Sequence, residues 1–190
     1  GKEMTFPLKR NWVSVETVLG VKRNADADWD YTIDAKNKIG YIRLTQFAKN
    51  SARDLKRAVI DLVQQNNLKG LVLDLRFNPG GLLTGSVEIS DLFIDDGRIV
   101  SIRPRVGQEH SFDGDRDGSL LNFPMVCLVN GGSASASEIV SACLQDHKRA
   151  VIIGERSFGK GSVQTLLPLG QTAALKRTTA LYFTPAGHSG

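Results

Sequence analysis

A serine-containing turn and a glycine-flanked lysine are the parts of this sequence best suited to chemistry. The turn, Asn130–Ile139, places Ser135 after two glycines, at the predicted start of a helix. Lys160 stands between Gly159 and Gly161, beside apolar neighbours. A serine whose hydroxyl proton is taken by a neutral lysine is a strong nucleophile, so the two residues are typical of a Ser-Lys hydrolase.

The predicted helix start gives Ser135 two competing roles. The first backbone N–H groups of a helix have no partner inside the helix, and they can hold an oxyanion at about 3 kcal/mol per donor. Ser135 and Glu138 also have the spacing of a capping box, S-x-x-E, in which the serine is purely structural. Ser133 and Ser137 compete for either role, so this segment alone leaves the nucleophile open.

Lys160 serves as a base only if its amine is neutral, and burial favours the neutral form. Phe158, Val163 and the flanking glycines are the neighbours expected to supply a tight, dry site. The competing interpretation of Gly-Lys-Gly is a flexible, exposed loop. Gln164 follows Lys160 by four residues and shares its face in an extended chain, so its amide is placed to orient the amine.

A third segment, Asp74–Gly81, ends a predicted buried strand in Asn-Pro-Gly-Gly. Gly80 and Gly81 allow the backbone to take a positive φ or to approach a ligand closely. The carboxyl end of a parallel strand is where α/β folds bind ligands. The competing interpretation is an ordinary turn in which Asp74 and Arg76 pair as structural charges.

Hydrophobic periodicity predicts the elements that position these segments. Strand and helix alternate, which predicts an α/β core with largely parallel pairing. We expect strands at 70–76, 124–129 and 150–154 to be buried, and Ser51 to be an N-cap. The full prediction has further strands at 40–47, 99–102, 163–167 and 176–183, helices at 51–66, 82–94 and 136–146, and a loop at 103–121.

Composition favours one globular domain. The 190 residues are 41% hydrophobic and 23% charged, with a net charge of +4. Basic residues are scattered among acids rather than clustered, which argues against a nucleic-acid partner. Cys127 and Cys143 lie in apolar segments and are interpreted as core residues, so we expect neither a disulfide nor a metal site. None of the three histidines has the setting of a triad base.

Four stretches together resemble the C-terminal processing (tail-specific) serine peptidases: 40–47, 74–81, 130–139 and 154–164. The family's Tyr-x-Thr-Pro-x-Gly turn is present at 182–187, so the resemblance covers nearly the whole chain. It implies the fold of crotonase and the Clp protease. It also implies a serine endopeptidase that cleaves proteins near their C-termini through an acyl-enzyme, without a cofactor or a metal.

The resemblance also assigns roles to residues. The nucleophilic serine of the family precedes its lysine by 25 positions, which selects Ser135 and Lys160. Gln164 matches the glutamine that positions the lysine. The oxyanion donors match the backbone N–H groups of Gly81 and Ala136.

Further expectations rest on the same family. Asp146, eleven positions after the serine, matches a supporting aspartate of some members. Residues 1–38 are expected to hold the last strand of a PDZ domain, around 5–10, and a β segment entering the core. Residues 39–190 are expected to be the protease core, truncated at its C-terminus. The partners implied are protein or peptide substrates bound by their C-terminal tails, and the compartment implied is a bacterial cell envelope or periplasm.

Two other functions fit the same residues less well. A crotonase-type acyl-CoA enzyme shares the implied fold, but it needs carboxylates rather than a Ser-Lys pair. A non-catalytic peptide-binding core would bind tails without turnover.

Overall fold

A central sheet with largely parallel strands organises the molecule. The computed structural model describes residues 3–11, 15–115, 117 and 119–189, with only the backbone of residues 65 and 66. The sheet has the order β1-β5-β6-β9-β10, with β4 also paired to β5. Its parallel strands are β5 (Ile39–Leu44), β6 (Gly70–Asp74), β9 (Met125–Val129) and β10 (Ala150–Gly154).

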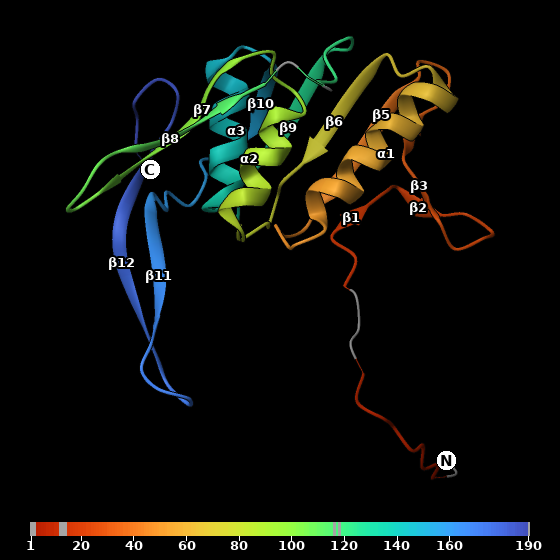
Figure 1. Ribbon diagram of the computed structural model, residues 1–190. Helices are drawn as coiled ribbons and strands as arrows, with labels where there is room; N and C mark the ends of the chain where they lie inside the picture. The colour runs from red at the N-terminus through yellow and green to blue at the C-terminus, as the bar shows by residue number, and fades with distance from the viewer. Residues whose placement is uncertain (1–2, 12–14, 116, 118, 190) are drawn as a thin grey trace.

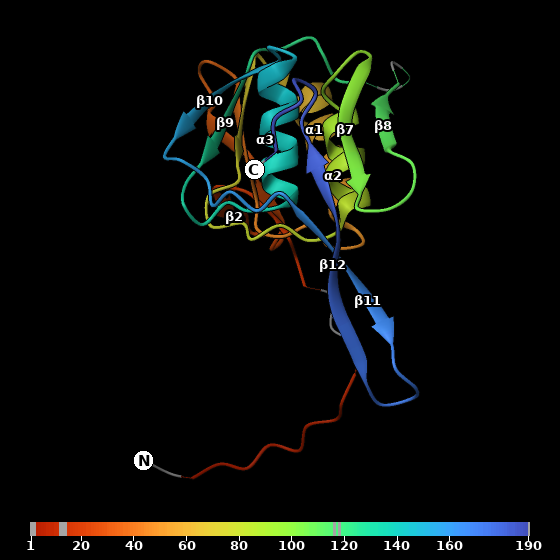
Figure 2. The same cartoon turned by 90° about the vertical axis from the view of Figure 1, so that its left-hand side faces the viewer.

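Three helices cover one face of this sheet (Figures 1 and 2). They are α1 (Ser51–Asn66), α2 (Leu83–Asp91) and α3 (Ala136–Asp146), which follow β5, β6 and β9 in the chain. α2 packs against both α1 and α3. The core lies between helices and sheet, and its largest fully buried side chains include Phe47, Phe93, Ile42, Leu73 and Leu144. The α/β prediction is therefore confirmed.

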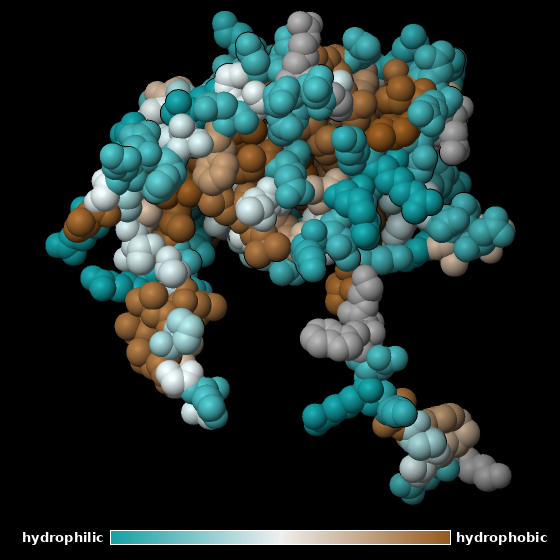
Figure 3. Space-filling model, in the orientation of Figure 1, coloured by the Kyte–Doolittle hydropathy of each residue, from teal (hydrophilic) through white to brown (hydrophobic). Residues whose placement is uncertain are grey.

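An antiparallel sheet lies on the far side of the helices (Figure 2). Its order is β11-β12-β7-β8, from β7 (Gly97–Pro104), β8 (His110–Gly114), β11 (Ser162–Pro168) and β12 (Ala174–Phe183). β12 pairs with β7 over Ala180–Phe183. The rest of the β11–β12 hairpin stands away from the body and carries an apolar surface (Figures 1 and 3).

A small N-terminal β segment enters the core, as expected. β1 (Val18–Leu19) and β4 (Thr32–Asp34) pair antiparallel with β5, and β2 (Lys22–Arg23) pairs with β3 (Trp29–Asp30). The strand expected around residues 5–10 is not formed. Those residues are exposed, and within the described ranges no strand lies beside them to complete a hydrogen-bonded ladder.

Three local predictions were wrong. β10 is an edge strand that pairs with β9 alone among the described strands, and its outward side chains are exposed, Val151 by 62%. Ser51 is the first residue of α1 rather than its N-cap, and its hydroxyl bonds the carbonyl of Gln46 and the N–H of Ala48 instead. The loop expected at 103–121 contains β8, which completes a hairpin with β7.

Candidate active site

The loops that follow β6 and β9 meet at the carboxyl edge of the central sheet. Asn78, a fully buried residue of the first loop, joins them. Its carbonyl accepts the N–H of Ala134 at 3.0 Å, and its side-chain oxygen accepts the N–H of Gly80 at 2.9 Å. Its side-chain amide donates to the carbonyl of Leu44 at 2.8 Å, which fastens the loop to the end of β5. The candidate site therefore stands on rigid backbone.

The structure separates the three competing serines by their surroundings. Ser133 and Ser137 are both 0% exposed. Their hydroxyls donate to the carbonyls of Leu75, at 2.8 Å, and Asn78, at 2.9 Å. Ser135 is partly exposed, so among the three it has the hydroxyl that a substrate can reach.

Ser135 also occupies strained backbone. Its φ of 57° and ψ of −113° lie outside the regions that non-glycine residues favour. Strain of this kind costs of order 1–3 kcal/mol and persists only where neighbouring contacts enforce it. Such residues cluster at functional sites. The capping box is nevertheless present as well, with Ser135 and Glu138 as its two members, so the structural and the functional interpretation of this turn coexist.

Glu138 does more than cap α3, and sequence reasoning missed this. Its side chain is buried, with the residue 8% exposed. One carboxylate oxygen accepts the N–H groups of Ser135, at 2.7 Å, and Lys160, at 2.9 Å. The other accepts the Ser157 hydroxyl at 2.8 Å and the Gly159 N–H at 2.6 Å. The S-x-x-E spacing indicates the first contact, but nothing in the sequence indicates the loop from 157 to 160, because it lies about twenty residues away.

Lys160 lies just before β11 and is partly buried. Its loop is also held by the N–H of Phe158, which donates to the carbonyl of Ser133 at 3.0 Å. The dry wall expected from Phe158 is absent, because that side chain points outward and is 69% exposed. Gln164 is exposed on β11, and no hydrogen bond between described residues joins it to Lys160. Its positioning role stays a prediction.

The two expected oxyanion donors lie on neighbouring segments. Gly80 has a φ of 97°, and a Cβ added there would lie 2.6 Å from the carbonyl oxygen of Ala134 and 2.9 Å from the nitrogen of Ala136. The backbone on either side of Gly81 pairs with Phe47. Within the described part of the chain, neither the Gly81 nor the Ala136 N–H has a protein acceptor, so neither group is committed to another contact.

Asp146 is not beside Ser135. It ends α3, eleven residues further on, which corresponds to about 16 Å along the helix axis. One of its carboxylate oxygens accepts the N–H of Ala186 at 2.9 Å. This contact fastens the turn that follows β12 to the far end of α3.

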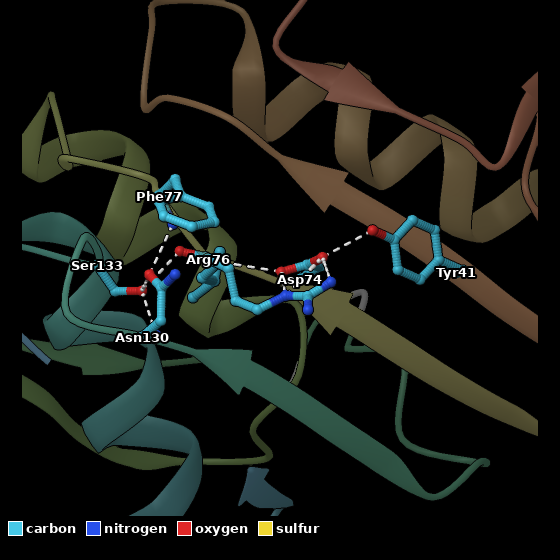
Figure 4. Close-up of polar contacts among 7 residues, drawn as sticks. Tyr41, Asp74, Arg76, Phe77, Asn130 and Ser133 are labelled. Atoms are coloured by element: carbon cyan, nitrogen blue, oxygen red, sulfur yellow. Dashed lines mark hydrogen bonds and ion pairs between the residues drawn. The ribbon is translucent and has the colours of Figure 1, made fainter. Parts of the chain in front are cut away.

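A buried carboxylate, that of Asp74, pairs with the half-exposed Arg76 at the base of the site (Figure 4). Arg76 bonds both carboxylate oxygens of Asp74, the shortest contact being 2.7 Å, and the Tyr41 hydroxyl donates to the same carboxylate at 2.7 Å. Burial raises the pKa of Asp74, but the hydrogen bonds from Arg76 and Tyr41 outweigh it and hold the pKa below its usual value. The structural interpretation of Asp74 and Arg76 fits this geometry.

Asn130 shapes the turn before the serines (Figure 4). Its side-chain oxygen accepts the N–H groups of Phe77, at 2.9 Å, and Gly132, at 3.1 Å. A hollow of about 580 Å³ opens here, between the turn and the ends of β6 and β10. Its lining residues include Arg76, Phe77, Asn130 and Glu155.

In the described ranges, no three His, Cys, Asp or Glu side chains gather as metal ligands. No helix in these ranges is long and apolar enough to span a membrane.

Comparisons with known proteins identify the family of the chain. The model of peptidase family S41 matches residues 38–190. The carboxy-terminal-processing protease of Bartonella bacilliformis is 52% identical over 155 residues, which are 80% of this chain and 36% of that protein. The carboxy-terminal processing protease CtpA of Bacillus subtilis is 36% identical over 95% of this chain and 36% of its own length.

A solved structure, a photosystem II D1 C-terminal processing protease, superposes with a TM-score of 0.76. It is 34% identical, and the match covers 93% of this chain and 46% of that one. The predicted fold is thereby confirmed. The chain spans about a third of the length of the curated relatives it matches.

Proposed function

This chain belongs to peptidase family S41, and we propose that it is the catalytic core of a serine endopeptidase that cleaves proteins near their C-termini. The names of its relatives support the substrate class. The observation that carries the chemistry is the setting of Ser135, which is accessible, strained, and next to two N–H groups that have no acceptor among the described residues.

The proposed reaction uses a Ser-Lys dyad. The Oγ of Ser135 attacks the scissile carbonyl while the neutral amine of Lys160 takes its proton. The N–H groups of Gly81 and Ala136 stabilise the resulting oxyanion, each by about 3 kcal/mol. Lys160 then gives the proton to the leaving amine, which leaves an acyl-enzyme. Water, deprotonated by Lys160, attacks the acyl-enzyme; the ester bond breaks, the new C-terminal carboxyl group is released, and Lys160 returns the proton to the Oγ of Ser135.

The other parts of the proposal concern supporting residues and context. Gln164 orients the amine of Lys160, and Asp146 acts at a distance by fastening the turn after β12 to α3. Residues 1–38 lead from a PDZ domain into a protease core at 39–190, and the start of the family match at residue 38 supports this boundary. The compartment is a bacterial cell envelope, since its relatives are bacterial and chloroplast processing proteases.

The test is covalent labelling with a serine-reactive fluorophosphonate, combined with hydrolysis of an unfolded protein that ends in an apolar tail. We expect the label on the peptide containing Ser135. Labelling and hydrolysis should both be lost in Ser135→Ala and fall by at least about 10³-fold in Lys160→Ala. An acyl-CoA enzyme would not be labelled, and a binding core would retain the tail without hydrolysing it. Either result would reject the proposal.

A further inference from the structure

We infer that Glu138 is a positioning residue of the proposed dyad, whose carboxylate fixes the distance between Ser135 and Lys160. The inference rests on the proposed function and deepens it. Ser135 and Lys160 are 25 positions apart in the sequence and lie on different loops. A dyad built from two loops needs a contact that holds the two loops at a fixed distance from each other.

The carboxylate of Glu138 makes that connection directly. One oxygen accepts the backbone N–H of both dyad residues, Ser135 and Lys160, at 2.7 and 2.9 Å. The other holds the lysine loop at two more points, the Ser157 hydroxyl and the Gly159 N–H. Because Glu138 is only 8% exposed, competition from water for these bonds is limited.

The physical conditions favour a strong, rigid connection. Hydrogen bonds to an ionised acceptor are about twice as strong as neutral ones. The positive end of the α3 macrodipole stabilises a carboxylate in the first turn of the helix. The lysine loop needs the support, since Gly159 takes a φ of 85° and its Cβ position faces open space. A displacement of about 1 Å between reacting groups costs on the order of 10²-fold in rate.

The substitution Glu138→Gln distinguishes this positioning role from simple packing. Glutamine matches glutamate in size but offers a single acceptor oxygen. Each carboxylate oxygen of Glu138 receives two donors, and at least one of each pair is a backbone N–H. Either orientation of the glutamine amide therefore points its NH₂ group at an N–H donor and loosens one side of the connection.

The experiment compares the chain with Glu138→Gln, Ser157→Ala and, as a matched control, Glu88→Gln, which alters an exposed glutamate of α2. For each variant, kcat and KM are measured on the unfolded substrate, together with the unfolding midpoint and the rate of fluorophosphonate labelling. We expect Glu138→Gln to lower kcat and the labelling rate about 10²-fold with KM changed less than about threefold. Ser157→Ala should lower kcat about three- to tenfold, and Glu88→Gln should change nothing.

Two results would overturn the inference. One is a kcat of Glu138→Gln equal to that of the Glu88→Gln control. The other is a loss that vanishes once activity is measured well below the unfolding midpoint, which would make Glu138 purely structural. If Glu138→Gln does not fold, Ser157→Ala decides, because it keeps the carboxylate and the cap. Failure of the dyad itself is distinct, since it shows as retained activity in Ser135→Ala or Lys160→Ala.

Discussion

At the scale of single residues, burial separates the polar groups that have structural roles from those that are free to react. The carboxylates of Asp74 and Glu138 are both buried, and each is fully engaged by donors. The buried hydroxyls of Ser133 and Ser137 are engaged too, since each donates to a backbone carbonyl. Ser135 differs from all four in being accessible, and this contrast singles it out more clearly than its sequence neighbours do.

Asp74 should link stability to acid pH. Its folded pKa lies below the usual value of about 4, so the stabilisation is present above pH 4 and is lost as the pH falls through the folded pKa. We expect Asp74→Asn to lower the free energy of unfolding at pH 7 by about 1–3 kcal/mol and to flatten the acid limb of the stability curve. Denaturant unfolding from pH 7 to pH 2 measures both effects.

Asp113→Asn is the control for this prediction. Asp113 pairs with Arg98 at 2.6 Å, but it is 56% exposed, so its loss should cost at most about 1 kcal/mol. Equal losses for the two variants would show that the burial of Asp74 adds nothing.

At the scale of elements, the site depends on glycines that let two loops touch. Gly80→Ala would place a Cβ 2.6 Å from the carbonyl oxygen of Ala134 and require a positive φ from alanine. We expect it to lower the free energy of unfolding by about 1–3 kcal/mol and kcat by about 10²-fold, because the Gly81 N–H moves with it. Thermal unfolding and turnover of the same samples test this.

Gly85→Ala is the matched control, since its Cβ would meet the Phe47 side chain at an ordinary 3.7 Å. Alanine also favours a helix, so this variant should be neutral or slightly more stable. A Gly80→Ala enzyme with normal kcat would mean that the contact between the two loops does not place the oxyanion donors.

Sequence periodicity predicts the elements well where burial enforces it. The range 136–146 of α3 is predicted without error, because its apolar spacing and its Gly-Gly entry agree. The edge position of β10 is missed, since an apolar run of five residues reads the same at an edge as in the middle of a sheet. The contacts of Glu138 with the lysine loop are missed for a related reason. These contacts depend on the path of the loop that follows β10, which returns to the start of α3. No local sequence pattern encodes that path.

At the scale of the whole molecule, the core encloses both cysteines. Burial raises the pKa of the Cys127 thiol to about 12, and that of Cys143 likewise to about 12. We expect neither thiol to react with a disulfide reagent at pH 8 in the folded protein, since the thiolate is the reactive form. Both should react on unfolding in guanidinium, at the same midpoint as the loss of helical circular dichroism. Fast reaction of one thiol before that midpoint would show that the core opens in parts.

The β11–β12 hairpin has a mechanical consequence. β12 pairs with β7 over Ala180–Phe183, and the tip of the hairpin projects away from the body (Figure 1). Lys160 lies at the base of this hairpin, between Gly159 and Gly161. A force applied to the tip is therefore transmitted to the segment that carries Lys160. An antibody fragment against residues 166–175 should then change turnover while it binds several residues away from Lys160.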